Sequence, residues 1–225
     1  MTAPAIVFDL DGTLVESAPD LAATTNILLA RRGRRQIELG ELRSMVGKGA
    51  KVMIEKAWIA TGEPVTEAEI KEMIPEFLEY YGEHVSDKTL PFPGVIDALD
   101  ELKGRGCPLG VCTNKFESLS NKLLKALNMD HYFDAVLGGD TLKIRKPDPE
   151  HVLETIRRLG RTPENAVMVG DSNNDIDAAK SGGVASIAVT FGYTDIPPEE
   201  LGADRMISHF DKLISAIDEL INAPG

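Results

Sequence analysis

The sequence has few of the features that mark secreted or membrane-bound proteins. Its 225 residues include only two cysteines, Cys107 and Cys112, which are too few for a disulfide framework. No run approaches the roughly 18 apolar residues of a membrane helix. The N-terminus carries neither the basic segment nor the apolar segment of a secretion signal. We therefore expect a cytoplasmic protein with no membrane partner.

Positive charge is also scarce. The chain has 24 lysine and arginine residues against 36 aspartate and glutamate residues, a net charge of −12. Because nucleic acids and anionic membranes are bound through basic patches, we expect neither as a partner. Gly47-Lys48-Gly49 is not a P-loop, because the required earlier glycine and the following Ser or Thr are missing. A phosphorylated substrate would need a metal ion or an individually placed lysine.

What the sequence does contain is a set of short apolar runs typical of buried strands. None of these runs alternates between apolar and polar residues, a pattern that favours parallel strands covered on both faces. Helical patterns alternate with the later runs, and Asp148-Pro149 is a helix start signal. We predict a doubly wound, Rossmann-like parallel α/β sheet. The runs are residues 5–10, 109–113, 133–137, 166–170 and 185–191.

One long segment departs from this alternation. Between residues 16 and 90 no convincing strand is found, but helical patterns cover residues 19–32, 51–60 and 67–81, each followed by a glycine. This predicts two domains. Residues 16–91 form an inserted all-helical cap domain, and residues 1–15 and 92–225 form the α/β core domain.

Polar residues follow the ends of the predicted strands. Ligands of parallel α/β sheets bind beyond the carboxyl ends of the strands, so these residues are the site candidates. They are Asp9 and Asp11 after the first run, Thr113 and Asn114 after the second, Lys146 after the third, and Asp171 and Asp175 after the fourth. The four histidines are scattered and show no metal-ligand spacing.

Each of these residues alone also has an ordinary structural interpretation. A strand-end aspartate is often a turn former, Thr113 and Asn114 suit helix capping, and a loop lysine such as Lys146 is usually solvated. Asp175 either caps the helix that follows or supports the site. Asp9 and Asp171 together change the balance, because gathered carboxylates repel one another unless a cation lies among them. A hard, oxygen-rich site of this kind favours Mg²⁺.

In their order along the chain, these motifs resemble the haloacid dehalogenase superfamily of phosphohydrolases. The resemblance is carried by Asp9-Leu10-Asp11-Gly12-Thr13, Thr113, Lys146, and Gly170-Asp171 with Asp175. Residues 16–90 are similar to the helical cap of one branch of that superfamily. Within this branch, the segments 46–50, 113–115 and 146–149 resemble those of phosphoglycolate phosphatases.

The resemblance implies a role for each candidate. Asp9 attacks phosphorus and carries an aspartyl phosphate, Asp11 acts as the acid and base, and Lys146 with Thr113 and Asn114 holds the phosphoryl group. Mg²⁺ is held by Asp9, by Asp171 and by the backbone carbonyl of Asp11, with Asp175 in support. The cap loop Gly47, Lys48 and Gly49 binds the substrate, a small phosphorylated metabolite. The alternative for this loop is a simple helix-entry turn with Lys48 solvated.

Several other functions stay open from the sequence. A signalling receiver domain gathers similar residues, but its phosphate-accepting aspartate ends a middle strand and it carries no helical insertion. Within the superfamily, the alternatives are a sugar-phosphate phosphatase, a phosphotransferase resembling β-phosphoglucomutase, and a pyrophosphatase. A monomer and a homodimer are both compatible with the sequence.

Overall fold

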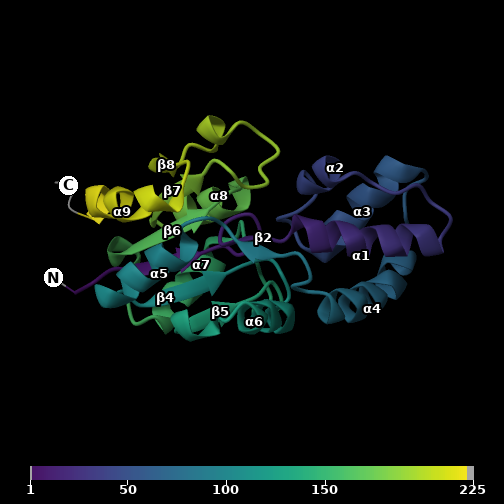
Figure 1. Cartoon of the computed structure of the whole chain (residues 1–225). Helices are drawn as coiled ribbons and strands as arrows, with labels where there is room; N and C mark the ends of the chain where they lie inside the picture. The colour runs from purple at the N-terminus through teal and green to yellow at the C-terminus, as the bar shows by residue number, and fades with distance from the viewer. Residues whose placement is uncertain (1, 222–225) are drawn as a thin grey trace.

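A parallel sheet forms the centre of the molecule (Figure 1). In the computed structural model, which describes residues 2–221, six strands lie in the order β5-β4-β1-β6-β7-β8 and each neighbouring pair is parallel. The strands are β1 (Ala5–Phe8), β4 (Leu109–Cys112), β5 (Ala135–Leu137), β6 (Ala166–Gly170), β7 (Ala185–Val189) and β8 (Arg205–Ile207).

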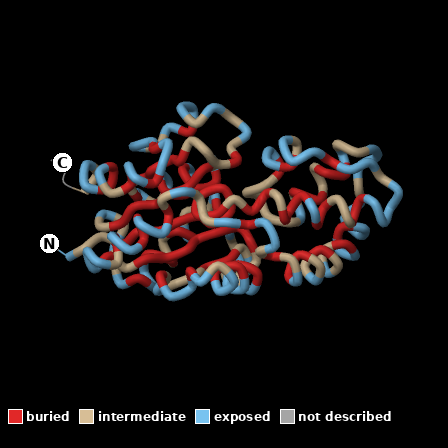
Figure 2. The backbone as a smooth tube through the Cα atoms, in the orientation of Figure 1, coloured by how far each residue is buried: buried red, intermediate tan, exposed pale blue. Residues whose placement is uncertain are grey.

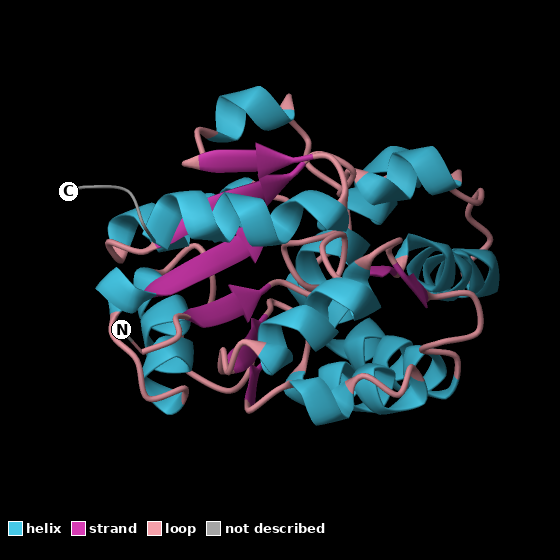
Figure 3. Cartoon of the chain, turned by 60° about the vertical axis from the view of Figure 1, so that its left-hand side comes forward, coloured by secondary structure: helices cyan, strands magenta, loops and turns pink. Residues whose placement is uncertain are grey.

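Helices cover both faces of this sheet. Successive side chains of a strand point to opposite faces. Ile6 and Phe8 of β1 belong to the core that includes residues of α5, α6 and α9, whereas Ala5 and Val7 pack in a second core with α7 and α8. This arrangement confirms the expected doubly wound α/β fold (Figure 3). The helices are α5 (Val95–Gly104), α6 (Glu117–Ala126), α7 (Pro149–Arg158), α8 (Asn173–Ser181) and α9 (Leu213–Ile221).

The predicted start of α7 is confirmed in its atomic detail. The Asp148 side chain accepts a hydrogen bond of 3.0 Å from the Glu150 N–H, and Pro149 occupies the first helical position. The cap satisfies one of the N–H groups that have no partner inside the helix, and proline contributes no N–H of its own. The loop immediately before α7, which carries Lys146, is therefore attached to a well-defined helix end.

A separate group of four helices lies beyond the carboxyl ends of the strands (Figures 1 and 3). The chain enters it through β2 (Val15–Glu16) and leaves it through β3 (Leu90–Pro91), and these two short strands pair antiparallel. The buried Asp20 carboxylate accepts hydrogen bonds from the backbone N–H groups of Lys88 and Thr89, which ties the entering helix to the departing strand. The helices are α1 (Ala18–Arg31), α2 (Leu39–Arg43), α3 (Ala50–Thr61) and α4 (Glu67–Glu83).

Some short elements were not expected from the sequence. They are β8, α2, α5 and the 3₁₀ turns η1 (Asp130–Tyr132), η2 (Pro163–Asn165), η3 (Pro198–Leu201) and η4 (Phe210–Lys212). β8 has three residues at the sheet edge, and its Arg205 and Met206 are exposed, so it lacks the apolar run that marks the inner strands.

Buried residues concentrate in the sheet and along the inner sides of helices α1 to α4 (Figure 2). Between residues 2 and 221, no helix has both the length and the apolar character needed to cross a membrane.

Candidate active site

The predicted polar residues converge at the carboxyl edge of the sheet, facing the helical group. Asp9 and Asp11 follow β1, Thr113 and Asn114 follow β4, and Asp171 follows β6, because three adjacent parallel strands end at the same edge. All five side chains are buried, as are Lys146 and Asp175. Such burial of charged groups requires compensating partners.

Lys146 is the central cation of this cluster. Its Nζ donates to Asp9 Oδ1 at 2.9 Å, to Asp175 Oδ1 at 2.5 Å and to the carbonyl of Cys112 at 2.5 Å. Burial by itself lowers the pKa of Lys146, but the Asp175 and Asp9 carboxylates outweigh burial and hold this pKa above its ordinary value. The peptide bond between Lys146 and Pro147 is cis, and the Lys146 carbonyl accepts a hydrogen bond from Asn114 Nδ2 at 3.0 Å. Lys146 is thus a fixed, permanently charged group beside Asp9.

Three carboxylates gather around this lysine. One oxygen from each of Asp9, Asp171 and Asp175 lies within 4.8 Å of the others. Burial raises the pKa of Asp9 to about 6, with repulsion from Asp175 adding to the shift and Lys146 opposing it. Burial, followed by repulsion from Asp175 and Asp9, raises the pKa of Asp171 well above its usual range. A bound cation would relieve both effects, so this donor set fits a hard divalent metal ion.

The carboxylate cluster contains Asp175 and not Asp11, whereas the predicted metal ligands include Asp11 and not Asp175. The expected set was Asp9, Asp11 and Asp171, with Asp11 contributing its backbone carbonyl. The structure brings the Asp175 side chain into the cluster, while the Asp11 carboxylate points to Lys115. Asp175 also accepts from the Ser172 N–H at 3.0 Å, so it caps α8 as well as lying in the cluster, and its support of a metal site stays a prediction.

Asp171 is held from two sides. Its Oδ2 accepts a hydrogen bond of 2.6 Å from the Tyr193 N–H, and its Oδ1 accepts from Thr13 Oγ1 at 3.4 Å. Gly12 has a φ of 86° and packs directly against the Asp171 carboxylate, where a Cβ would collide. Glycine at this position therefore serves both the left-handed backbone and the close approach.

Asp11 pairs with Lys115, which also contacts Tyr81, and the sequence singled out neither of these two as a site residue. Lys115 Nζ donates to the Asp11 oxygens at 3.0 and 3.2 Å and to the Tyr81 hydroxyl at 2.7 Å. Lys115 comes from the loop after β4, and Tyr81 from α4 of the helical group. The triplet Thr113-Asn114-Lys115 was visible in the sequence, but the pairing of its lysine depends on how α4 folds over the sheet.

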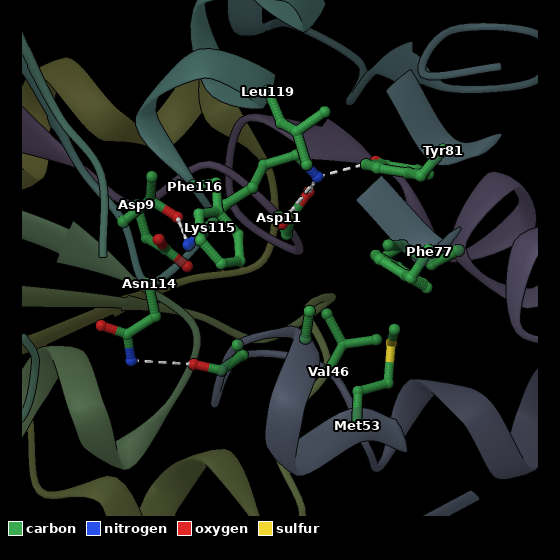
Figure 4. A pocket seen from close by; sticks show the side chains of 15 residues that line it. Asp9, Asp11, Val46, Met53, Phe77, Tyr81, Asn114, Lys115, Phe116 and Leu119 are labelled. Atoms are coloured by element: carbon green, nitrogen blue, oxygen red, sulfur yellow. Dashed lines mark hydrogen bonds and ion pairs between the residues drawn. The ribbon is translucent and has the colours of Figure 1, made fainter. Parts of the chain in front are cut away.

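A small cavity connects these groups (Figure 4). The volume in which the centre of a water molecule can lie is about 40 Å³. A single water needs roughly 10–15 Å³ on this measure, so the space beside Asp9 and Asp11 suits a small chemical group. The lining combines the polar strand ends with apolar side chains from the helical group: Asp9, Asp11, Leu21, Val46, Gly47, Gly49, Ala50, Met53, Phe77, Tyr81, Thr113, Asn114, Lys115, Phe116 and Leu119.

The cap loop reaches this cavity through its backbone. Gly47 and Gly49 line the cavity, and the Gly47 carbonyl accepts hydrogen bonds from Asn114 Nδ2 at 3.1 Å and from Asn174 Nδ2 at 3.2 Å. Lys48 is not among the lining residues. Its Nζ lies 3.3 Å from Asp195 Oδ2 on the core, so a contact between Lys48 and substrate stays a prediction.

Comparison with known proteins is consistent with this geometry. A family model described as haloacid dehalogenase-like hydrolase matches residues 6–189. A Mesorhizobium japonicum protein named phosphoglycolate phosphatase is 43% identical over 226 residues, covering 100% of both chains. A Caulobacter vibrioides protein of the same name is 42% identical over 91% of this chain and 86% of its own.

Solved structures give the same result. The crystal structure of a predicted phosphoglycolate phosphatase from Haemophilus somnus superposes with a TM-score of 0.90 at 34% identity, covering 96% of this chain and 99% of the other. Likeness of this extent includes the helical group as well as the sheet.

Proposed function

The chain belongs to the haloacid dehalogenase-like hydrolase family, and we propose that it hydrolyses 2-phosphoglycolate by transferring the phosphoryl group to Asp9. The observation that carries this proposal is the position of Asp9. Its carboxylate lines a small cavity beside Asp11 and Thr113, and Lys146 Nζ lies 2.9 Å from one of its oxygens. The chemistry is that of a phosphoric monoester hydrolase.

Asp9 is suited to act as the nucleophile. With a pKa of about 6 it is mostly ionised at neutral pH, so no separate base is needed before its oxygen attacks phosphorus. The obstacle is repulsion between a carboxylate and a phosphate. Lys146, held within the cluster by Asp175 and the Cys112 carbonyl, offsets this repulsion from a fixed position, and such preorganised charge costs little reorganisation during the reaction.

Asp11 and the loop after β4 complete the proposed machinery. Asp11 lines the same cavity as Asp9, where it would protonate the departing alkoxide and then deprotonate the water that opens the aspartyl phosphate. The Thr113 hydroxyl and the Asn114 N–H would hold the phosphoryl oxygens. Both residues line the cavity at the end of β4, next to β1 in the sheet.

We assign Mg²⁺ to the carboxylate cluster. Asp9 and Asp171 would hold it, with the Asp11 backbone carbonyl as the further ligand that the family resemblance implies and Asp175 in support. When bound, the ion neutralises carboxylate and phosphate charge during transfer. Tyr193 and Thr13 orient Asp171 for this role through their hydrogen bonds to its two oxygens.

The substrate assignment rests on the relatives and on cavity size. Proteins up to 43% identical over the full length are named phosphoglycolate phosphatase. A space of about 40 Å³ suits the carboxymethyl group of phosphoglycolate better than a sugar ring. We propose residues 16–91 as the cap that encloses this small metabolite and excludes water.

A panel of phosphate esters tests this proposal. We expect kcat/KM for 2-phosphoglycolate to exceed the values for glucose 6-phosphate, β-glucose 1-phosphate and pyrophosphate by at least about tenfold, which is about 1.4 kcal/mol of transition-state stabilisation. A smaller margin, or another substrate in first place, would overturn the substrate assignment and leave the phosphatase chemistry standing.

A further inference from the structure

Lys115 and Tyr81 form a polar pair at the helical end of the cavity. Lys115 Nζ lies 2.7 Å from the Tyr81 hydroxyl and 4.3 Å from the centre of the Tyr81 ring. The exposed fraction of the Lys115 side chain is 5%, and Tyr81 is fully buried. Both residues line the cavity that contains Asp9, and Figure 4 shows their side chains meeting beside Asp11. A small molecule attached to Asp9 through its phosphorus would reach this pair.

The pair offers a ligand a positive charge and a free O–H donor. The three N–H groups of Lys115 Nζ are matched among residues 2–221 by the two Asp11 oxygens and the Tyr81 hydroxyl, so Lys115 acts on a ligand mainly through its charge. The Tyr81 oxygen accepts from Lys115, while its own O–H has no acceptor within the described chain. Burial raises the pKa of Tyr81 well above its usual value, so this hydroxyl keeps its proton. A buried positive charge and one neutral O–H donor are thus available to a ligand oxygen.

The surroundings make this end of the cavity selective for an anion. Among the described residues lining the cavity, Lys115 is the one cation, and Phe77, Met53 and Leu119 in the same lining are apolar. Because the Lys115 side chain is buried, its charge is weakly screened and acts strongly on a ligand group. The Asp11 carboxylate lies on the other side of Lys115, so the ammonium also offsets repulsion between Asp11 and an incoming anion.

We propose that Lys115 and Tyr81 bind the carboxylate of the substrate and thereby select small phosphorylated carboxylic acids over neutral phosphate esters, an inference that rests on the proposed phosphatase function. The phosphoryl group lies at Asp9 and the carboxylate at the Lys115–Tyr81 pair. A neutral substrate would bring no charge to meet the buried ammonium and a weaker acceptor for the Tyr81 hydroxyl, and the loss of a charge-assisted contact in a buried site is a strong source of discrimination between substrates.

The test compares two substrates that differ only at the selected group. 2-Hydroxyethyl phosphate has a hydroxymethyl group where 2-phosphoglycolate has its carboxylate. We expect the ratio of the two kcat/KM values, phosphoglycolate over hydroxyethyl phosphate, to fall about tenfold in Tyr81→Phe. The matched control is Tyr80→Phe, the same chemical change one residue earlier, because Tyr80 stacks on His84 and does not line the cavity. Its ratio should equal that of the wild type.

Lys115→Gln is the second variant. It removes the charge and keeps an N–H donor, and because Asp11 also loses an ion-pair partner, turnover of both substrates should slow while the ratio still falls at least tenfold. Thermal melting of each variant establishes that it is folded. A high wild-type ratio that both variants retain within about twofold would overturn the proposed role of the pair alone. A wild-type ratio near one would overturn the proposed substrate, and the carboxylate-binding role with it.

Discussion

Tyr193 donates its backbone N–H to Asp171 Oδ2 at 2.6 Å, in the carboxylate cluster. The hydroxyl of the same residue accepts a hydrogen bond of 3.0 Å from the N–H of Ala18, the first residue of α1, and donates to Glu16 Oε1 at 2.7 Å. One buried residue, through its backbone and its side chain, therefore links the proposed metal site to the point where the chain enters the helical group.

Tyr193→Phe should lower the stability of the chain. The substitution keeps the ring and removes the hydroxyl, which leaves the Ala18 N–H without its acceptor. We expect the free energy of unfolding to fall by about 1–3 kcal/mol, the cost of an unpaired buried polar group. Denaturant unfolding measures this, with Tyr80→Phe as control. An unchanged unfolding midpoint in Tyr193→Phe would show that this linkage does not stabilise the fold.

Activity should require a divalent metal ion. Chelation should stop turnover and added Mg²⁺ should restore it, because the single charge of Lys146 does not balance the three carboxylates of Asp9, Asp171 and Asp175, whose oxygens lie within 4.8 Å of one another. Ca²⁺ should inhibit, since its higher coordination number allows it to take both Asp9 oxygens and occupy the attacking one. Assays with each ion after chelator treatment decide this, and full activity in chelator would contradict it.

Asp11→Asn should impair the departure of poor leaving groups most. An amide at this position can still accept a hydrogen bond from Lys115 but cannot transfer a proton. We expect the single-turnover rate of phosphoryl transfer to fall much more for an alkyl phosphate than for an aryl phosphate with a low-pKa phenol. Equal losses for the two esters would mean that Asp11 is structural.

His151 should make the chain less stable in weak acid. This histidine in α7 is fully buried, and burial, aided by the charge of Lys146, lowers its pKa from 6.5 to about 4. Between these values the unfolded chain binds more protons than the folded one, so stability is complete above about pH 6.5 and falls as the pH drops towards 4. The total for this group is about 3 kcal/mol.

The measurement for His151 is a difference between two chains. The pH dependence of unfolding in the wild type should exceed that of His151→Gln between pH 4 and 6.5, whereas the exposed His131→Gln should match the wild type. Identical pH profiles for His151→Gln and the wild type would contradict the shifted pKa.

The sheet and its edge were predictable because they follow from local patterns. Apolar runs predicted five of the six strands, and parallel strands must end at one edge, so Asp9, Thr113 and Asp171 had to lie near one another. β8 was missed because its three residues include the exposed Arg205 and Met206, which carry no strand signal.

The positions of the site residues from the helical group depend on tertiary packing, which no local sequence pattern predicts. Tyr81 ends the helical pattern predicted over residues 67–81, and only the folding of α4 over the sheet brings its hydroxyl to Lys115. Lys48 was expected at the substrate, yet it lies next to Asp195, a residue 147 positions away in the chain. Such pairings are set by how the helices α1 to α4 pack against the core.

Asp9 carries the central claim, and its phosphorylation can be measured directly. In Asp11→Asn, Asp9 is the one carboxylate left in the segment Phe8–Thr13, and the loss of the proton shuttle should slow opening of the intermediate. The enzyme is mixed with an aryl phosphate and Mg²⁺, quenched in acid and digested for mass spectrometry of its peptides. The account predicts a phosphoryl group on Asp9, and turnover by Asp9→Asn below about a hundredth of the wild-type rate, roughly 2.7 kcal/mol of barrier. A phosphoryl group on another residue, or an Asp9→Asn enzyme that keeps more than that rate, would contradict it.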